Sequence, residues 1–479
     1  MLEALIAETR NERHVRLLKA LQQASDFLER SEPPVLVVSH YDADGLSAAA
    51  AITLTLERLG LPYQLKIEEQ LTPELVEEAL KGPYETLIFL DMGSGVLSAI
   101  RGEKRVLVVD HHIPQGDPAP NVLEVNPHRY GVNGSVEVSS SSLALLVMDG
   151  AIGQGEDYAH LAIVGALGDR QDQGPRFALT GINGLIVALA REAGVIEETI
   201  GLRLYGVHSR PLVRALALTM DPLLPGLTGN EEACIKFLKS IGVNPVNGDR
   251  LRKYSELSIE EKRTLATELV KLLINSGYPV NEAERIFGTM YYIRREDAQS
   301  PLRDAREFSY IVNACGRLDR HSIALLLLRG VKGEIIARAL DQVRLYRKLL
   351  FRAIRAARDG ACNRIRLGKI LALDYGETVP PKVAGALASI LASSLKTDAT
   401  VLLVMVKHGD RHVKVSARKT AGRGRVNIGE ALSIAARASG GVGGGHAEAG
   451  GALLPAENTE IFLNELNRAL EGVSSEVNM

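Results

Sequence analysis

The first part of the chain alternates short apolar runs with longer amphipathic stretches. The runs at residues 34–38, 86–90 and 105–109 are typical of buried strands in a parallel sheet, because both faces of such strands are covered. The helical stretches between them lie at residues 46–59, 73–81 and 96–101. Repeated strand–helix units predict an α/β fold with a doubly wound, mostly parallel sheet and helices on both faces.

The alternation fades near residue 204, and four regions follow from the pattern. Residues 1–204 form the first predicted domain, and residues 205–300 are mainly helical, which predicts an inserted helical module. Residues 301–362 are strongly helical and are expected to complete the first domain and link it to the next. From residue 363 to 479 an α/β pattern returns, which predicts a smaller second domain.

Composition narrows the classes of protein that need to be considered. Of 479 residues, 46% are hydrophobic and 24% charged, as in ordinary globular proteins. The 56 basic residues nearly balance the 58 acidic ones, so a polyanion would have to meet local basic patches. Three widely spaced cysteines without a CxxC pair argue against a disulfide scaffold or a zinc ribbon. Without a signal-peptide pattern or a membrane-length apolar run, we expect a cytoplasmic protein with no membrane partner.

Acidic and imidazole side chains follow the ends of the predicted elements. The segments are His40-Tyr-Asp42-Ala-Asp44 and Asp110-His111-His112, with Asp91 after another strand and Asp169 after the apolar helix at 158–167. The carboxyl ends of parallel strands meet at one edge of a doubly wound sheet, where ligands bind. We therefore expect these side chains to converge.

The chemistry of these side chains predicts a hard-cation site. Carboxylates with one or two imidazoles suit Mn²⁺ or Mg²⁺ better than ions that select thiolates. The alternative is that Asp42, Asp44 and Asp91 are helix caps or loop residues, as most aspartates after strands are. Three of the segments each add another ligand-type residue, so we favour a metal site, and the number of carboxylates suggests two ions.

These motifs resemble a known family. His40-Tyr-Asp42-Ala-Asp44-Gly45, Asp91, Asp110-His111-His112 and Gly168-Asp169 are similar to the four motifs of the DHH phosphoesterases. Ser416-Ala-Arg418 and Gly443-Gly-Gly-His446 resemble the DHHA1 domain that accompanies them, and Asn313-Ala-Cys-Gly-Arg317 resembles a helix motif of RecJ-type exonucleases. With its helical insertion, the chain most resembles the archaeal RecJ-like nucleases associated with the GINS replication complex.

The resemblance implies a role for each matching residue. One metal would be held by His40, Asp42 and Asp91, and the other by Asp44, Asp91, His111 and Asp169, with Asp91 as the bridge. Asp110 would orient a neighbouring imidazole, and His112 would contact the scissile phosphate or protonate the leaving oxygen. The residues implied in substrate binding are Arg418, His446, Gly444, Gly445, Ser416, Arg317 and Asn313. Bacterial RecJ usually carries aspartate where His40 stands, which is a departure from that pattern.

Two basic stretches could contact phosphates. The first comprises Lys407, Arg411, Lys414, Arg418, Lys419, Arg423 and Arg425. The second follows a predicted helix and comprises Arg344, Arg347, Lys348, Arg352, Arg355 and Arg358, with Leu345, Leu349 and Ile354 expected toward the core. Either stretch could instead be a solvated face. Aromatic residues make up only 4%, so extensive base stacking is not indicated.

The combined expectation is a DHH-family phosphodiesterase with two Mn²⁺ or Mg²⁺ ions. It would digest single-stranded DNA, and RNA as a further substrate, to mononucleotides in replication or repair. Digestion from 5′ to 3′ is expected on DNA, although a chain that ends soon after the DHHA1-like region leaves no room for the OB-fold of bacterial RecJ. The alternatives are a phosphodiesterase for short oligonucleotides or cyclic dinucleotides, and a mainly non-catalytic replication scaffold. GINS is the expected partner, with residues 205–300 as its candidate docking module.

Overall fold

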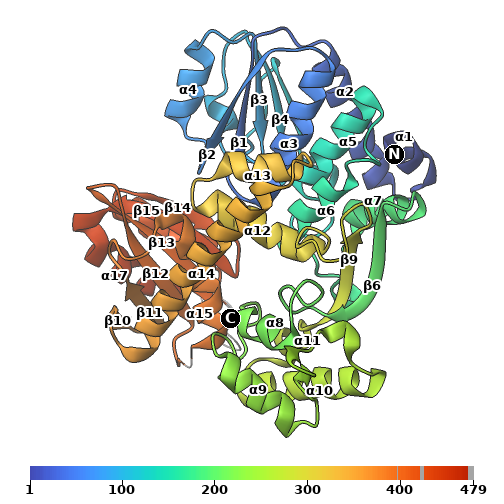
Figure 1. Cartoon of the computed structure of the whole chain (residues 1–479). Coiled ribbons are helices and arrows are strands. Elements are labelled where there is room, and N and C mark those ends of the chain that lie inside the picture. Colours follow the sequence, from blue (N-terminus) through green and yellow to red (C-terminus); the bar gives the residue numbers. More distant parts are fainter. Residues whose placement is uncertain (396, 421–425, 473–479) are drawn as a thin grey trace. The chain divides into compact units, whose positions relative to one another are not determined.

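The computed structural model describes residues 1–395, 397–420 and 426–472. It divides into two compact units, each built from two segments of the chain (Figure 1). The first unit comprises Met1–Ser209 and Phe287–Val343, and the second comprises Arg210–Ile286 and Arg344–Met479.

The first unit is built on a parallel sheet in the order β2-β1-β3-β4-β5. Its strands are β1 (Val35–His40), β2 (Tyr63–Glu68), β3 (Thr86–Leu90), β4 (Arg105–Val109) and β5 (Val122–Val125). Figure 1 shows α4 (Pro73–Lys81) on one side of this sheet and α3 (Ala43–Arg58) on the other. The predicted α/β fold with a parallel, doubly wound sheet is confirmed.

The strand order places the functional edge of the sheet. Connections from β1 lead to β2 on one side, while β3, β4 and β5 follow on the other, so the order reverses between β1 and β3. At such a reversal, the loops after two neighbouring strands turn in opposite directions. A crevice therefore opens between them at the carboxyl ends of the strands. The segments after β1 and β3 begin with His40 and Asp91, so both lie at this point.

Further helices and one two-stranded ribbon complete the first unit. The helices are α1 (Leu2–Glu8), α2 (Glu12–Glu29), α5 (Ser140–Ile152), α6 (Ala159–Gly168), α7 (Gly181–Glu192), α12 (Ala305–Arg317) and α13 (His321–Leu328). The ribbon pairs β6 (Ile196–Leu202) with β9 (Phe287–Ile293) in antiparallel register. The predicted helix at 96–101 is only a single 3₁₀ turn at Leu97–Ala99.

Strand β9 differs from the expected mainly helical pattern over residues 205–300. Its partner β6 lies far upstream in the sequence, so no local pattern could indicate the pairing. Its tyrosines are buried: Tyr291 and Tyr292 are 2% and 6% exposed. The hydroxyl of Tyr291 accepts a hydrogen bond from the backbone N–H of Leu179 (2.8 Å), so this pair is core and does not offer a stacking surface.

The second unit contains the helical insertion and a mixed sheet. The insertion comprises α8 (Leu212–Leu218), α9 (Glu231–Ser240), α10 (Ile259–Asn275) and α11 (Val280–Glu284), with the short strands β7 (Val246–Asn247) and β8 (Arg250–Leu251). The long helix α14 (Glu334–Asp359) leads into a sheet in the order β10-β11-β12-β13-β15-β14. Its strands are β10 (Asn363–Leu367), β11 (Ile370–Asp374), β12 (Val401–His408), β13 (His412–Lys419), β14 (Val442–Gly445) and β15 (Ala449–Pro455).

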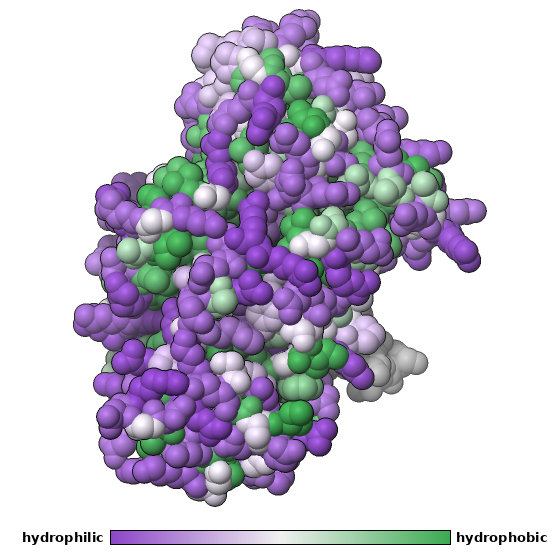
Figure 2. Space-filling view, turned by 45° about the vertical axis from the view of Figure 1, so that its right-hand side comes forward, coloured by the Kyte–Doolittle hydropathy of each residue, from purple (hydrophilic) through white to green (hydrophobic). Residues whose placement is uncertain are grey.

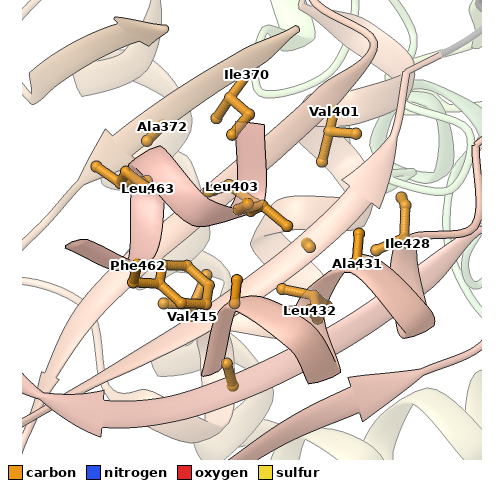
Figure 3. Close-up of a cluster of buried hydrophobic side chains, with 14 of the residues drawn as sticks. Ile370, Ala372, Val401, Leu403, Val415, Ile428, Ala431, Leu432, Phe462 and Leu463 are labelled. Atoms are coloured by element: carbon orange, nitrogen blue, oxygen red, sulfur yellow. The ribbon is translucent and has the colours of Figure 1, made fainter. Parts of the chain in front are cut away.

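Three helices accompany this mixed sheet: α15 (Pro381–Ser394), α16 (Ile428–Ala438) and α17 (Thr459–Gly472). Alternate strand residues such as Leu403 and Val415 pack against Leu432 and Phe462 in a continuous apolar cluster (Figure 3). Burial of these side chains on one face of the sheet stabilises the domain and leaves the opposite face to α15.

Figure 2 shows hydrophilic side chains over most of the face in view, with hydrophobic ones in separate patches. Within the described residues, the helices are all too short or too polar to cross a membrane.

Candidate metal centre

The loop after β1 begins the site and at the same time caps α3. Asp42 is the N-cap, and its Oδ1 accepts hydrogen bonds from the backbone N–H groups of Asp44 and Gly45 (both 3.1 Å). Its Oδ2 lies 3.1 Å from Nδ1 of His40. The capping interpretation and the ligand interpretation therefore use different oxygens of one carboxylate, and both can hold.

Asp44 lies in the first turn of α3 and meets the N-terminus of α5. Its Oδ2 and Oδ1 accept hydrogen bonds from the backbone N–H groups of Ser140 (2.8 Å) and Ser141 (3.0 Å). A helix N-terminus stabilises a nearby carboxylate. Gly165 in α6 leaves the necessary room, because a Cβ there would lie 2.6 Å from Asp44 Oδ1 and 2.0 Å from Ser141 Oγ.

Asp91 follows β3 and occupies the centre of the cluster. Its φ of 58° is in the left-handed region, which few residues other than glycine, asparagine and aspartate adopt. Its Oδ2 lies 3.3 Å from His40 Nδ1, and its Oδ1 lies 3.3 Å from His111 Nε2. Oδ1 is buried, and among the described residues it finds no hydrogen bond of good geometry.

The three side chains of the Asp110-His111-His112 segment after β4 have different hydrogen-bond partners. Asp110 Oδ1 accepts from both the backbone N–H and Nδ1 of His112 (3.1 and 2.8 Å), so the carboxylate orients His112. His111 Nδ1 lies 2.7 Å from the backbone oxygen of Gly134, which fixes this nitrogen as the donor and leaves Nε2 for a cation. The His112 side chain is 50% exposed, and its contact with substrate stays a prediction.

Asp169 is the C-cap of α6 and belongs to the same cluster. Its Oδ2 lies 3.6 Å from His111 Nε2, and that nitrogen also lies 3.8 Å from Asp44 Oδ2. Ligand-type atoms gather in overlapping sets within 4.8 Å: His40, Asp42 and Asp91; Asp44, His111 and Asp169; and Asp91, His111 and His112. The structure thus brings together all six residues predicted as ligands, and their role as ligands stays a prediction.

The electrostatics of this cluster suit a cation. Burial would lower the pKa of His40, but Asp42 and Asp91 raise it well above its usual value. Burial would also lower the pKa of His111. The charges of Asp169, Asp91 and Asp44 outweigh burial and raise that pKa well above its usual value. Burial and the charge of Asp91 raise the pKa of Asp44 to about 7. In the metal-free protein, bound protons therefore offset the negative charge of these carboxylates. Bound metal ions would take over that role.

The donor set of the cluster fits hard divalent cations. Aspartate oxygens with imidazole nitrogens form the ligand types that Mn²⁺ accepts and Mg²⁺ tolerates. Asp91 directs its Oδ2 toward His40 and its Oδ1 toward His111. Its Oδ1 makes no hydrogen bond of good geometry among the described residues and is therefore available to a cation once His111 loses its proton.

Helix α12 supports the first loop from behind. Asn313 Oδ1 accepts a hydrogen bond from the backbone N–H of Ala43 (3.1 Å). Gly316 allows close approach, because a Cβ there would lie 1.9 Å from the backbone oxygen of Tyr41. Arg317, half-buried at the end of the helix, contributes to lowering the pKa of Asp42. The structure therefore places Asn313 and Arg317 beside the cluster, and their contact with substrate stays a prediction.

The other predicted substrate residues lie in the mixed sheet. Ser416 and Arg418 on β13 both face Gly385 of α15, whose Cβ would lie 3.9 Å from Ser416 Oγ and 3.5 Å from Arg418 Nη2. Arg418 Nε donates to Ser389 Oγ (2.9 Å). Gly444 and Gly445 form the end of the edge strand β14 rather than a free loop, and His446 follows directly.

The two basic stretches are only partly as expected. On α14, Arg344, Lys348, Arg352, Arg355 and Arg358 are exposed. Arg347, however, is buried, and Leu345 is 47% exposed instead of facing the core, because helical spacing puts these two on the opposite sides to those predicted. In the other stretch, Arg423 and Arg425 lie outside the described residues.

The site contains residues that the sequence did not single out. Gln171 and Asn183 are both buried and hydrogen-bonded to each other beside Asp169. Neither belongs to a motif, and amides in a polar loop and in an amphipathic helix give no local signal of a shared contact.

Three family models match the chain. They are the DHH family N-terminal domain at residues 34–166, the DHH-CID domain at residues 204–287 and the DHHA1 domain at residues 367–472. An uncharacterised protein of Methanocaldococcus jannaschii is 28% identical, over 91% of this chain and 93% of its own. The single-stranded-DNA-specific exonuclease RecJ of Dickeya dadantii is 30% identical over a matched region. That region covers 24% of this chain and 22% of the relative.

Solved structures agree on the fold. RecJ of Thermus thermophilus in complex with Mn²⁺ matches with a TM-score of 0.57 at 19% identity, over 95% of this chain and 55% of its own. CDC45 of Entamoeba histolytica matches with a TM-score of 0.62 at 11% identity, over 95% and 98% of the two chains. With DHH, DHH-CID and DHHA1 domains in this order, the chain belongs to the DHH/DHHA1 family as a RecJ-like member, and the phosphoesterases of that family are hydrolases.

Proposed function

We propose that this protein is a metal-dependent exonuclease that hydrolyses single-stranded DNA, and also RNA, to mononucleotides with two divalent ions. The observation that carries the proposal is Asp91, whose Oδ2 lies 3.3 Å from His40 Nδ1 and whose Oδ1 lies 3.3 Å from His111 Nε2, so that its two oxygens face two clusters of ligand-type atoms. The name of the RecJ relative supports the choice of single-stranded DNA as substrate. Mn²⁺ and Mg²⁺ are the candidate ions, since RecJ structures that share the fold contain one or the other.

Each residue of the centre contributes a definite action. His40, Asp42 and Asp91 would hold one ion, and Asp44, His111 and Asp169, with Asp91, the other. Bound there, a pair of divalent ions supplies Lewis-acid stabilisation of phosphate and lowers the pKa of water. Gly134 and Asp110 keep the imidazoles of His111 and His112 in the required orientation. Burial lowers the pKa of His112, but the charge of Asp110 raises it, and the net shift is upward. A protonated His112 would be suited to donate a proton to the leaving oxygen.

The second unit supplies the proposed phosphate contacts. Ser416 and Arg418 lie on one face of β13, and Gly444 and His446 lie at the edge of the same sheet. A guanidinium and backbone N–H groups that glycine leaves accessible are suitable partners for a phosphate. Arg418→Lys and His446→Ala should raise KM for a long strand with little effect on Mn²⁺ binding.

A nuclease assay tests the proposal. A single strand labelled at one end and blocked at either end in turn should be shortened stepwise only when Mn²⁺ or Mg²⁺ is added. Digestion of only the strand with a free 5′ end would give the expected polarity. Asp91→Asn keeps a residue that tolerates the left-handed backbone, and it should reduce the rate by at least about 100-fold. Undiminished degradation by this variant would contradict the site assignment.

Two other functions remain to be separated from this one. A phosphodiesterase for short oligonucleotides or cyclic dinucleotides would turn over dinucleotides faster than long strands. A replication scaffold is suggested by the shared fold with CDC45, and it predicts GINS binding without hydrolysis. Since all six candidate ligands converge in this chain, we place catalysis first and GINS binding as an added role of the helical insertion.

A further inference from the structure

A buried chain of polar side chains lies behind part of the metal centre. Gln171 is fully buried, and its Nε2 donates to the backbone oxygen of Gly134 (2.9 Å) and to Asp169 Oδ2 (3.1 Å). The same Gly134 oxygen receives the Nδ1–H of His111 (2.7 Å). One amide thus positions two candidate ligands at once.

The chain continues from Gln171 to the start of α5. Asn183 Nδ2 donates to Gln171 Oε1 (2.7 Å), and Asn183 Oδ1 accepts from Ser142 Oγ (2.6 Å) and the backbone N–H of Ser139 (3.3 Å). The next two backbone N–H groups of this turn, those of Ser140 and Ser141, bind Asp44. Asp169 and Asp44 therefore lie at the two ends of one hydrogen-bonded path.

The path reaches only one of the two proposed ion positions. Asp44, His111 and Asp169 form one of the candidate ligand sets, and each is held by this chain of contacts. His40 and Asp42 in the other set are oriented by each other and by the N-terminus of α3. Side-chain amides are suited to orienting these ligands. They do not change charge between acidic and basic pH, and the N–H and C=O groups of Gln171 and Asn183 are already hydrogen-bonded, so they do not compete for the cation.

We propose that Gln171 and Asn183 are positioning residues for the ion held by Asp44, His111 and Asp169, and that they leave the other ion position unaffected. The inference rests on the proposed two-ion function. Outer partners of metal ligands commonly change affinity by roughly 10–100-fold, and that is the effect expected here for one site.

Calorimetric titration of metal-free protein with Mn²⁺ tests this without measuring activity. The wild type should bind two ions, and Gln171→Met, which keeps the length but removes the amide, should weaken one of them about 10–100-fold. In a His40→Ala background only the site of Asp44, His111 and Asp169 remains, so adding Gln171→Met should weaken the single remaining ion by the same factor. Gln173→Met is the matched control, since the side chain of Gln173 is exposed in the same loop and donates to the backbone oxygen of Arg170, away from the candidate ligands.

The outcomes separate the two proposals. A wild type that binds fewer than two Mn²⁺ ions would overturn the two-ion function, and this inference with it. Two ions in the wild type, with both weakened equally or neither weakened in Gln171→Met, would overturn the inference alone. If Gln171→Met does not fold, as judged by its thermal unfolding without metal, Asn183→Ala decides in the same way, because it removes the support of Gln171 while leaving every candidate ligand in place.

Discussion

At the scale of single residues, the candidate centre is a set of carboxylates and imidazoles held close together by backbone and amide contacts. The sequence indicated the aspartates and histidines, because charged residues after apolar strands stand out. It could not indicate Gln171 or Asn183, since their partners come together only when α5, α6 and α7 pack. It offered a helix cap and a metal ligand as alternatives for Asp42, and it could not show that one oxygen caps α3 while the other faces His40.

The binding of Mn²⁺ should depend steeply on pH. Without metal, the pKa values of His40 and His111 are raised well above their usual value, and that of Asp44 is raised to about 7, so near neutral pH these groups carry protons. A ligand must lose its proton to bind, so binding releases protons and the affinity rises with pH. Each proton released changes the apparent Kd about tenfold per pH unit.

Titrations between about pH 6 and about pH 8 in two buffers of different ionisation enthalpy measure this release. Tighter binding at the higher pH, with protons transferred to the buffer, is the expected result. Binding that is independent of pH would show that these groups are not the ligands.

At the scale of elements, the parallel sheet was predictable because three of its strands, β1, β3 and β4, contain continuous apolar runs. Strands β2 and β5 were not predictable in this way, because β2 alternates polar with apolar residues and β5 is only four residues long. The ribbon of β6 and β9 was not predictable either, since its two strands lie on either side of the inserted module. The ribbon also contacts the loop after Asp169, because Thr289 Oγ1 donates to the backbone oxygen of Arg176 (3.0 Å). Elements distant in sequence thus hold the loop that carries a candidate ligand.

The packing of α12 on the loop after β1 should be sensitive to one methyl group. Gly316→Ala places a Cβ where the backbone oxygen of Tyr41 lies, so α12 or the loop must shift. We expect the free energy of unfolding to fall by roughly 1–3 kcal/mol and the Mn²⁺ affinity to fall with it. Urea unfolding measures the first and titration the second. Gly95→Ala, with open space around its Cβ, should change neither, and equal behaviour of the two variants would argue against this packing role.

At the scale of the whole molecule, the inserted segment interrupts the first unit without contributing a candidate ligand. The unit boundaries fall at Ser209 and Phe287, inside the predicted module of residues 205–300. The DHH-CID match covers residues 204–287, so it ends where β9 begins. A deletion that tests the role of the insertion must therefore keep β9.

Replacing residues 210–286 with a short glycine–serine linker should abolish binding to GINS and preserve Mn²⁺ binding, because all six candidate ligands and β9 remain. Deleting residues 205–300 removes β9 and its contacts with Leu179 and Arg176, so this larger deletion should lose metal binding as well. A pull-down with GINS and a Mn²⁺ titration report the two effects. GINS binding that survives the smaller deletion would show that the insertion is not the docking module.

The claim on which the account depends is that Asp91 bridges two ions. Diffraction data collected at the manganese absorption edge from crystals grown with Mn²⁺ test it most directly. The account predicts two anomalous peaks on opposite sides of Asp91, one beside His40 and Asp42 and the other beside Asp44, His111 and Asp169. A single peak, or peaks that leave Asp91 without contact to either ion, would contradict it.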